Sequence, residues 1–144
     1  MINFRTMKKL IFVIFILSCL RTWSQNNIQT VLINMAEQEK SWNNGDIPGF
    51  MKHYWQNDSL RFIGKKGITY GWQNTLNNYI KSYPDKKSMG ILHFTIEHSS
   101  QISETNIYII GKWLLEKEKP VGGYFTLLWK KINGLWVIVA DHTS

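Results

Sequence analysis

Residues 121–143 read VGGYFTLLWKKINGLWVIVADHT, and this stretch decides the fold of the 144-residue chain. Two runs rich in β-branched and aromatic residues flank the dipeptide Asn133-Gly134. Such a dipeptide is a strong signal for a two-residue hairpin turn, because both residues tolerate positive φ. We therefore predict an antiparallel pair of strands at 123–132 and 135–143.

Two further strands, at 89–99 and 106–117, precede this hairpin, because apolar residues recur with a period of two from Met89 onward. In the last three strands both alternating faces are apolar, whereas an antiparallel sheet with one solvated face alternates apolar and polar residues. Helices can cover only one face, so we expect a homodimer through the outer sheet face. The alternative is a strongly curled sheet that shields part of its own outer face.

Helical signals fill most of the preceding segment. Apolar side chains recur at helical spacing over 28–42, a short second helix begins with Asp46 as its N-cap, and a third helix covers 72–83. A short strand is expected at 59–64. Three helices, one strand and a four-stranded antiparallel meander describe an α+β domain with its helices packed on one face of the sheet.

The first 24 residues have the features of a signal peptide. Met7-Lys8-Lys9 precedes an apolar run over 10–17, and Thr22-Trp23-Ser24 places small residues before a cleavage site. We predict a signal peptide at 1–24 and an exported domain at 25–144, periplasmic or secreted.

Cys19, the one cysteine of the chain, lies inside this predicted signal peptide. Residues 16–19 also resemble a bacterial lipoprotein box, which would leave the protein anchored at Cys19. Plain cleavage is favoured because Leu17 is bulky where such boxes prefer a small residue. The mature domain would then contain no thiol, which excludes disulfides and cysteine nucleophiles.

The formal net charge of +7 is concentrated at the N-terminus. The chain has 17 Lys and Arg against 10 Asp and Glu, and the segment after position 24 retains 13 basic residues against all 10 acidic ones. This balance indicates no nucleic-acid partner. No later apolar run approaches the roughly 20 residues of a membrane-spanning helix, so no membrane contact is expected after signal removal unless Cys19 is lipidated.

The order of these elements and several local motifs resemble the nuclear transport factor 2-like superfamily, which includes ketosteroid isomerase, SnoaL-like cyclases, scytalone dehydratase and the association domain of calmodulin-dependent kinase II. The motifs are Trp42 to Asp46, Tyr70-Gly71-Trp72, Gly111-Lys112-Trp113 and the C-terminal stretch 123–144. They are most similar to an exported bacterial branch of unknown function. The resemblance implies a cone-shaped curved antiparallel sheet wrapped on three N-terminal helices, with a pocket between them.

The aromatic content agrees with such a pocket. Six of the seven Trp and all six Tyr lie in the mature domain, and each buried indole or phenol needs a hydrogen-bond partner. A small, largely apolar organic ligand suits a cavity of this kind. The alternative is that the rings only fill the cone. The residues we expect to bind ligand are Tyr54, Arg61, Tyr70, Trp72 and Trp113.

Two residues are candidates for acid–base catalysis. His142 shares its strand face with Trp136 and Ile138, so it is expected on the buried side, while Asp141 points to the other face if the strand stays regular. Asp58 matches, by the resemblance, a position where SnoaL-like relatives often carry an acid. Its alternative role is to cap a turn.

His93 and Glu97 share one face of the strand at 89–99. They form either an acid–base pair in the cavity or part of a solvated face, and the apolar character of the opposite face favours the second. No metal site is expected, because His93 and His98 face opposite ways and no other histidine has a partner at chelating spacing. No cofactor is expected either.

These features lead to two functional hypotheses. The first is an exported small-molecule-binding protein whose chemistry would be cofactor-free acid–base catalysis of the isomerase or lyase kind. The second is a non-catalytic assembly module like the kinase association domain.

Overall fold

Helices precede the sheet along the part of the chain that this computed structural model describes, residues 26–144. The predicted signal peptide and Cys19 lie outside the described residues. A first helix covers 26–43. The later elements are α2 (Ile47–Phe50), a 3-10 turn (Met51–His53), β1 (Arg61–Gly64), β2 (Gly67–Tyr70), α3 (Trp72–Ser82), α4 (Lys86–Met89), β3 (Ile91–Ser103), β4 (Asn106–Glu116), β5 (Val121–Ile132) and β6 (Leu135–Thr143).

The predicted helices and strands are present with bounds that differ by a few residues. Asp46 caps α2 as expected, since its side chain accepts a hydrogen bond of 2.8 Å from the Gly49 amide. Asn133 and Gly134 have φ of 50° and 82°, which confirms the tight hairpin between β5 and β6. The sequence prediction missed α4 and β2, both only four residues long.

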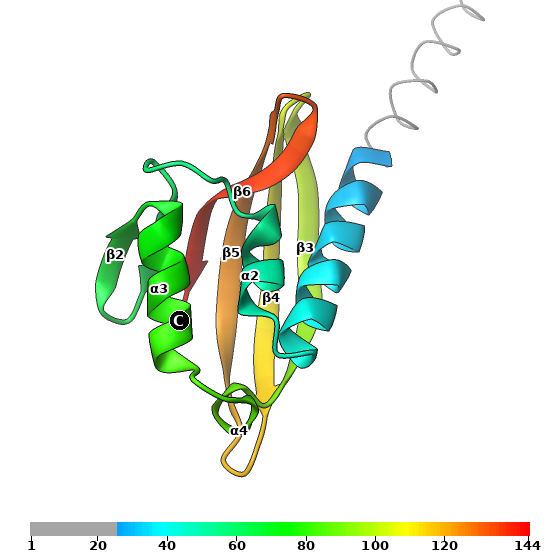
Figure 1. The fold of residues 1–144 in the computed structure, drawn as a ribbon. Coiled ribbons are helices and arrows are strands. Elements are labelled where there is room, and N and C mark those ends of the chain that lie inside the picture. Colours follow the sequence, from blue (N-terminus) through cyan, green and yellow to red (C-terminus); the bar gives the residue numbers. More distant parts are fainter. Residues whose placement is uncertain (1–25) are drawn as a thin grey trace, which may run out of the picture.

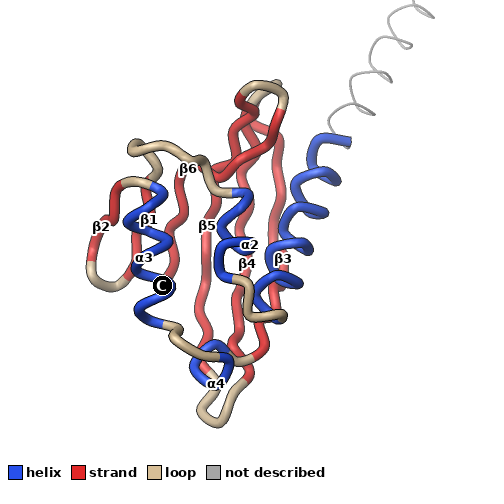
Figure 2. The backbone as a smooth tube through the Cα atoms, in the orientation of Figure 1, coloured by secondary structure: helices blue, strands red, loops and turns tan. Residues whose placement is uncertain are grey.

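The six strands form one curved sheet in the order β2-β1-β6-β5-β4-β3 (Figure 2). The expectation of a purely antiparallel sheet is wrong in one place, because β1 pairs with β6 in parallel. The sheet does not close, since β2 and β3 remain as edges. The first helix, α2 and α3 all lie on one face of the sheet, as an α+β fold of this class requires (Figure 1).

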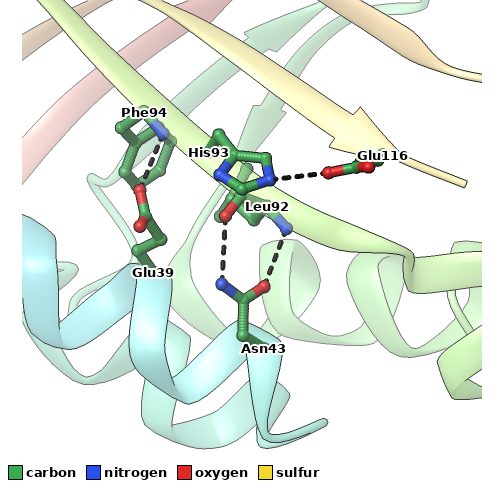
Figure 3. Close-up of polar contacts among 6 residues, drawn as sticks. All are labelled: Glu39, Asn43, Leu92, His93, Phe94 and Glu116. Atoms are coloured by element: carbon green, nitrogen blue, oxygen red, sulfur yellow. Dashed lines mark hydrogen bonds and ion pairs between the residues drawn. The ribbon is translucent and has the colours of Figure 1, made fainter.

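Side chains of the first helix pair with the exposed edge of β3 (Figure 3). The Asn43 side chain accepts from the Leu92 amide at 2.7 Å and donates to the Leu92 carbonyl at 3.0 Å. Glu39 accepts from the Phe94 amide at 2.7 Å. Unpaired backbone groups at a sheet edge invite pairing with another chain, so these contacts both cover the edge and attach the helix.

The core lies between the helices and the concave face of the sheet. Its buried members include Val31, Met35, Trp42, Met51, Leu60, Ile107, Ile109, Leu115, Trp129 and Ile138. On the opposite face Leu114 and Tyr124 are more than 40% exposed, while Ile110, Leu128 and Val137 are half-buried within the single chain. Curvature therefore shields part of the outer face and leaves an apolar remainder exposed.

No helix within residues 26–144 is both long enough and apolar enough to cross a membrane.

Candidate functional site

A cavity of about 120 Å³ lies between the concave face of the sheet and the helices. Its walls are mostly aromatic and aliphatic, and its polar members are few. The lining residues are Gln38, Trp42, Phe50, Tyr54, Phe62, Tyr79, Tyr83, Leu92, Phe94, Trp113, Leu115, Phe125, Leu127, Asp141 and Thr143. The volume is somewhat smaller than the roughly 150 Å³ of an apolar cavity that holds benzene.

Aromatic rings also fill much of the space between the helices and the sheet. Trp42 packs edge-to-face on Phe50 and on Tyr79, with ring centroids 5.2 and 6.0 Å apart. The cavity is the space that this cluster leaves open.

Asp141 is the one acidic side chain among the cavity's lining residues. It is only 5% exposed, and its Oδ2 accepts a 2.6 Å hydrogen bond from the hydroxyl of Tyr54. Its Oδ1 is buried without a hydrogen-bond partner among the described residues. Burial raises the pKa of Asp141 to about 7, and the Tyr54 hydrogen bond opposes this rise. Both protonation states are therefore populated near neutral pH.

The tyrosines beside Asp141 keep their protons. Burial, and then the charge of Asp141, raise the pKa of Tyr54 well above its ordinary value. The same two causes raise the pKa of Tyr79. Tyr54 is held in place because it forms a β-bridge with Ile138 of β6, and the amide of Trp55 donates to the Ile138 carbonyl at 2.9 Å. Tyr54 thus acts as a fixed hydrogen-bond donor.

A β-bulge in β6 turns Asp141 toward the cavity. Trp129 of β5 pairs with Ile138, but the next residue along β5, Leu128, pairs with Ala140, so Val139 is the extra residue. Beyond a bulge the alternation of side chains inverts. Asp141 consequently faces the same side as Ile138, and the expectation that His142 faces the core is wrong: His142 is exposed on the outer face.

Of the other candidates, Tyr54 and Trp113 line the cavity. The indole N–H of Trp113 is buried and has no partner among the described residues. Trp72 is half-buried but lies outside the lining, where its indole donates to the Met51 carbonyl at 3.0 Å. Tyr70 is 56% exposed, and Arg61 is exposed beside it in the β1–β2 pair.

Asp58 is exposed in the turn before β1 and does not line the cavity. The turn is capped by its neighbour Asn57, whose side chain accepts from the Ser59 amide at 2.9 Å. The structure thus brings only Tyr54 and Trp113 of the seven candidates to the cavity, and it adds Asp141. The sequence prediction missed Asp141 because it assumed regular alternation along 135–143. Nothing in the neighbouring sequence marks Val139 as the bulge residue.

His93 and Glu97 belong to the solvated face, as favoured from the sequence. His93 lies 3.1 Å from Glu116 (Figure 3), and Glu97 lies 2.8 Å from Lys112, all with exposed side chains. Among residues 26–144, no three His, Cys, Asp or Glu side chains gather in a cluster suited to a metal ion.

The fold and this cavity define an α+β protein with an aromatic pocket and a buried carboxyl group under a curved sheet. No family model and no curated protein matches the chain. Among solved structures it is similar to a nuclear transport factor 2-like protein of unknown function from Shewanella oneidensis MR-1, at 39% identity over 81% of this chain and 97% of that chain, with a TM-score of 0.78. The chain therefore belongs to the nuclear transport factor 2-like family.

More distant structures share the fold. A ketosteroid isomerase-like protein from Erwinia carotovora atroseptica SCRI1043 is 15% identical over 81% of this chain and 94% of that chain, with a TM-score of 0.63. A calcium/calmodulin-dependent protein kinase II association-like domain from Xanthomonas campestris is 11% identical over 79% and 84%, with a TM-score of 0.61. Proteins with this fold thus carry different functional descriptions, so the function of this chain must be argued from its site.

Proposed function

We propose that this protein binds a small, largely apolar organic molecule in the cavity and that Asp141 moves a proton to and from it. The observation that carries the proposal is a buried carboxyl group among the cavity's lining residues, that of Asp141, whose Oδ1 has no hydrogen-bond partner within residues 26–144. Leaving a buried polar atom unpaired costs about 1–3 kcal/mol, and more for a charged group. A bound molecule that pairs with Oδ1 would offset this cost.

The proposed chemistry needs no cofactor. Asp141 as a carboxylate takes a proton from a carbon next to a carbonyl group of the ligand, and the resulting acid returns the proton to the same or another carbon. No other atom is gained or lost. A general base works best when its pKa lies near the working pH, and the pKa of Asp141 is about 7. Tyr54 holds the carboxyl group in place during both steps.

This chemistry is tested by measuring how fast the protons next to the carbonyl group of cyclohexanone exchange for deuterium. Cyclohexanone in D₂O is followed by NMR with the wild-type protein, with Asp141→Asn and with Asp58→Asn as a control on the surface. We expect exchange above background for the wild type and the control, with a rate that rises with pH through about 7, and background exchange for Asp141→Asn. Equal exchange by Asp141→Asn and the wild type would reject Asp141 as the base.

Binding itself is tested by filling the cavity. Leu127 lines the cavity on β5 directly opposite Asp141, and Leu127→Trp would place a larger ring in the space. Saturable binding of cyclohexanone and toluene to the wild type should be lost in Leu127→Trp and kept in Tyr124→Ala, which changes the outer face. Thermal melting checks that both variants are folded. If the wild type binds neither probe at millimolar concentration, the proposed function is wrong.

Export is a part of the proposal that rests on residues 1–24. Their charged start, apolar run and small residues before position 25 are the features that signal peptidase recognises. Mass spectrometry of the protein recovered from bacterial fractions should find a chain beginning at Gln25 outside the cytoplasm. A chain that keeps residues 1–24 in the cytoplasm would contradict export, and a lipid on Cys19 would replace plain cleavage.

Assembly through the outer sheet face is a second candidate function. Leu114 and Tyr124 expose apolar surface there, and the similar structure from Xanthomonas campestris carries the name of an association domain. The mass in solution tests this: a dimer broken by Tyr124→Lys supports a homodimer through this face, a larger ring favours assembly as the function, and a monomer contradicts both.

A further inference from the structure

The side chains that line the cavity include one acid and no base. The acid is Asp141, and none of the lining residues, all of which lie within the described part of the chain, is Lys, Arg or His. We propose that the cavity accepts uncharged ketones and excludes ionised keto acids of the same shape, and that Asp141 sets this selectivity. The inference rests on the proposed function, because it names the class of carbonyl compound that Asp141 would deprotonate.

The charge of Asp141 acts through space, so this selectivity does not require one of its oxygen atoms to contact the ligand. The side chain is only 5% exposed. The Coulomb energy of two charges is inversely proportional to the effective dielectric constant, which is about 20 in protein sites and about 80 in water. Two lining tyrosines show the consequence: burial, and then the charge of Asp141, raise the pKa of both Tyr54 and Tyr79. An anion in these walls is therefore disfavoured.

Hydrogen-bond donors in the walls could offset the charge of a bound anion, but two of them already have partners in the protein. The side-chain amide of Gln38 donates to the Phe50 carbonyl at 3.0 Å, and the hydroxyl of Tyr54 donates to Asp141 at 2.6 Å. Burying a carboxylate without a charged partner and a full set of hydrogen bonds costs far more than burying a neutral carbonyl group. The walls therefore suit the neutral group.

Lys117 is the cation that could oppose this selectivity, because its Nζ lies 5.9 Å from the ring centroid of the lining residue Tyr83. Its ammonium group donates to the Ser88 carbonyl at 2.9 Å, and Lys117 does not itself line the cavity. We therefore expect Lys117 to attract no anion into the cavity, and its replacement is included in the test.

Pyruvate and 3-methyl-2-butanone test the inference, because they share one branched skeleton of non-hydrogen atoms and differ in charge. Their affinities are measured by NMR titration at pH 5 and pH 8 for the wild type, Asp141→Asn and Lys117→Met. The matched control is Asp58→Asn, which removes an exposed carboxylate outside the cavity lining. Thermal melting checks that each variant is folded.

We expect the wild type at pH 8 to bind 3-methyl-2-butanone more tightly than pyruvate by a factor of about ten or more. This ratio should shrink at pH 5, because Asp141, with a pKa of about 7, is then protonated while pyruvate stays ionised. Asp141→Asn should show the smaller ratio at both pH values. Asp58→Asn and Lys117→Met should behave as the wild type does.

Equal affinity of the wild type for the two compounds at pH 8 would overturn the inference and leave the proposed function standing. A ratio at pH 8 that is the same in Asp141→Asn and the wild type would also overturn it, and so would weaker binding of pyruvate alone in Lys117→Met. If the wild type binds neither compound at millimolar concentration, the proposed function itself fails.

Discussion

The two faces of the sheet differ in the environment of their polar groups. On the outer face His93 contacts Glu116 and Lys112 contacts Glu97, each pair in the open. On the concave face the carboxyl group of Asp141 and the indole of Trp113 are buried, and each has one polar atom without a partner in the part of the chain that the structure describes. Water can form hydrogen bonds with the outer groups even without their protein partners. The unpaired inner atoms, in contrast, raise the free energy of the folded protein until a ligand bonds with them. Function is therefore to be sought on the concave face.

The largest effect should come from removing the buried charge. Asp141 has a pKa of about 7 in the folded protein against about 4 in an unfolded chain, a difference of about 4 kcal/mol. Because the folded pKa is raised, the contribution of this group to stability is fully present below pH 4 and is lost as the pH rises through 7. We expect Asp141→Asn to be more stable than the wild type at pH 8 by a few kcal/mol.

Urea unfolding at pH 5 and pH 8 measures this difference. The stability of the wild type should fall between the two pH values relative to that of Asp141→Asn, which keeps an oxygen to accept from Tyr54. Asp58→Asn is the control at an exposed site and should keep the wild-type slope. If the free energy of unfolding changes equally with pH in the wild type and in Asp141→Asn, burial does not raise the pKa of the Asp141 carboxyl group.

An intermediate effect should come from crowding the concave face at Gly111. A Cβ atom there would overlap Cζ of Phe125 and lie 2.6 Å from the Thr95 carbonyl. We expect Gly111→Ala to lower the free energy of unfolding by about 1–3 kcal/mol, since overpacking forces neighbouring atoms to move. It should also weaken binding of cyclohexanone, because the displaced Phe125 ring lines the cavity.

Chemical denaturation compares this variant with Gly64→Ala on β1, where the nearest atom is the end of the Phe62 side chain at 3.2 Å. Gly64→Ala should lower the free energy of unfolding by less than Gly111→Ala does. Similar losses in both variants would mean that the concave face packs no more tightly at Gly111 than a strand near the sheet edge.

The smallest effect should come from the outer face. Glu97 and Lys112 are 42% and 46% exposed, and the hydrogen bond that Lys112 donates to Glu97 raises the pKa of Lys112 above its ordinary value. Exposed ion pairs contribute little and are screened by salt. We expect Glu97→Gln to leave the melting temperature unchanged in both low and high salt. A clear loss of stability in low salt would show that this face is less open to solvent than the single chain indicates.

The elements of the fold could be predicted because their signals are local. The Asn133-Gly134 turn, the N-cap at Asp46 and the period-two alternation after Met89 all act through neighbouring residues. The short β2 was missed because a four-residue strand at a sheet edge has little alternation to detect.

The site depended on contacts between distant residues. Tyr54 and Asp141 lie 87 positions apart and meet only because a β-bridge joins Tyr54 to β6. Trp113 and Tyr54 were predicted as candidates from their aromatic, polar-tipped side chains, and that chemistry is a property of the residue itself.

The sequence by itself therefore determined the longer helices and strands and an aromatic interior, since propensity and periodicity depend on neighbouring residues, whereas the four-residue α4 and β2 were missed. Only the tertiary structure decided that Asp141, and not His142, faces that interior. The extra residue at Val139 arises from how β6 pairs with β5, and a shift of one residue in that pairing exchanges the two faces of a strand. The position of a carboxyl group relative to the cavity was thus set by hydrogen bonds between strands.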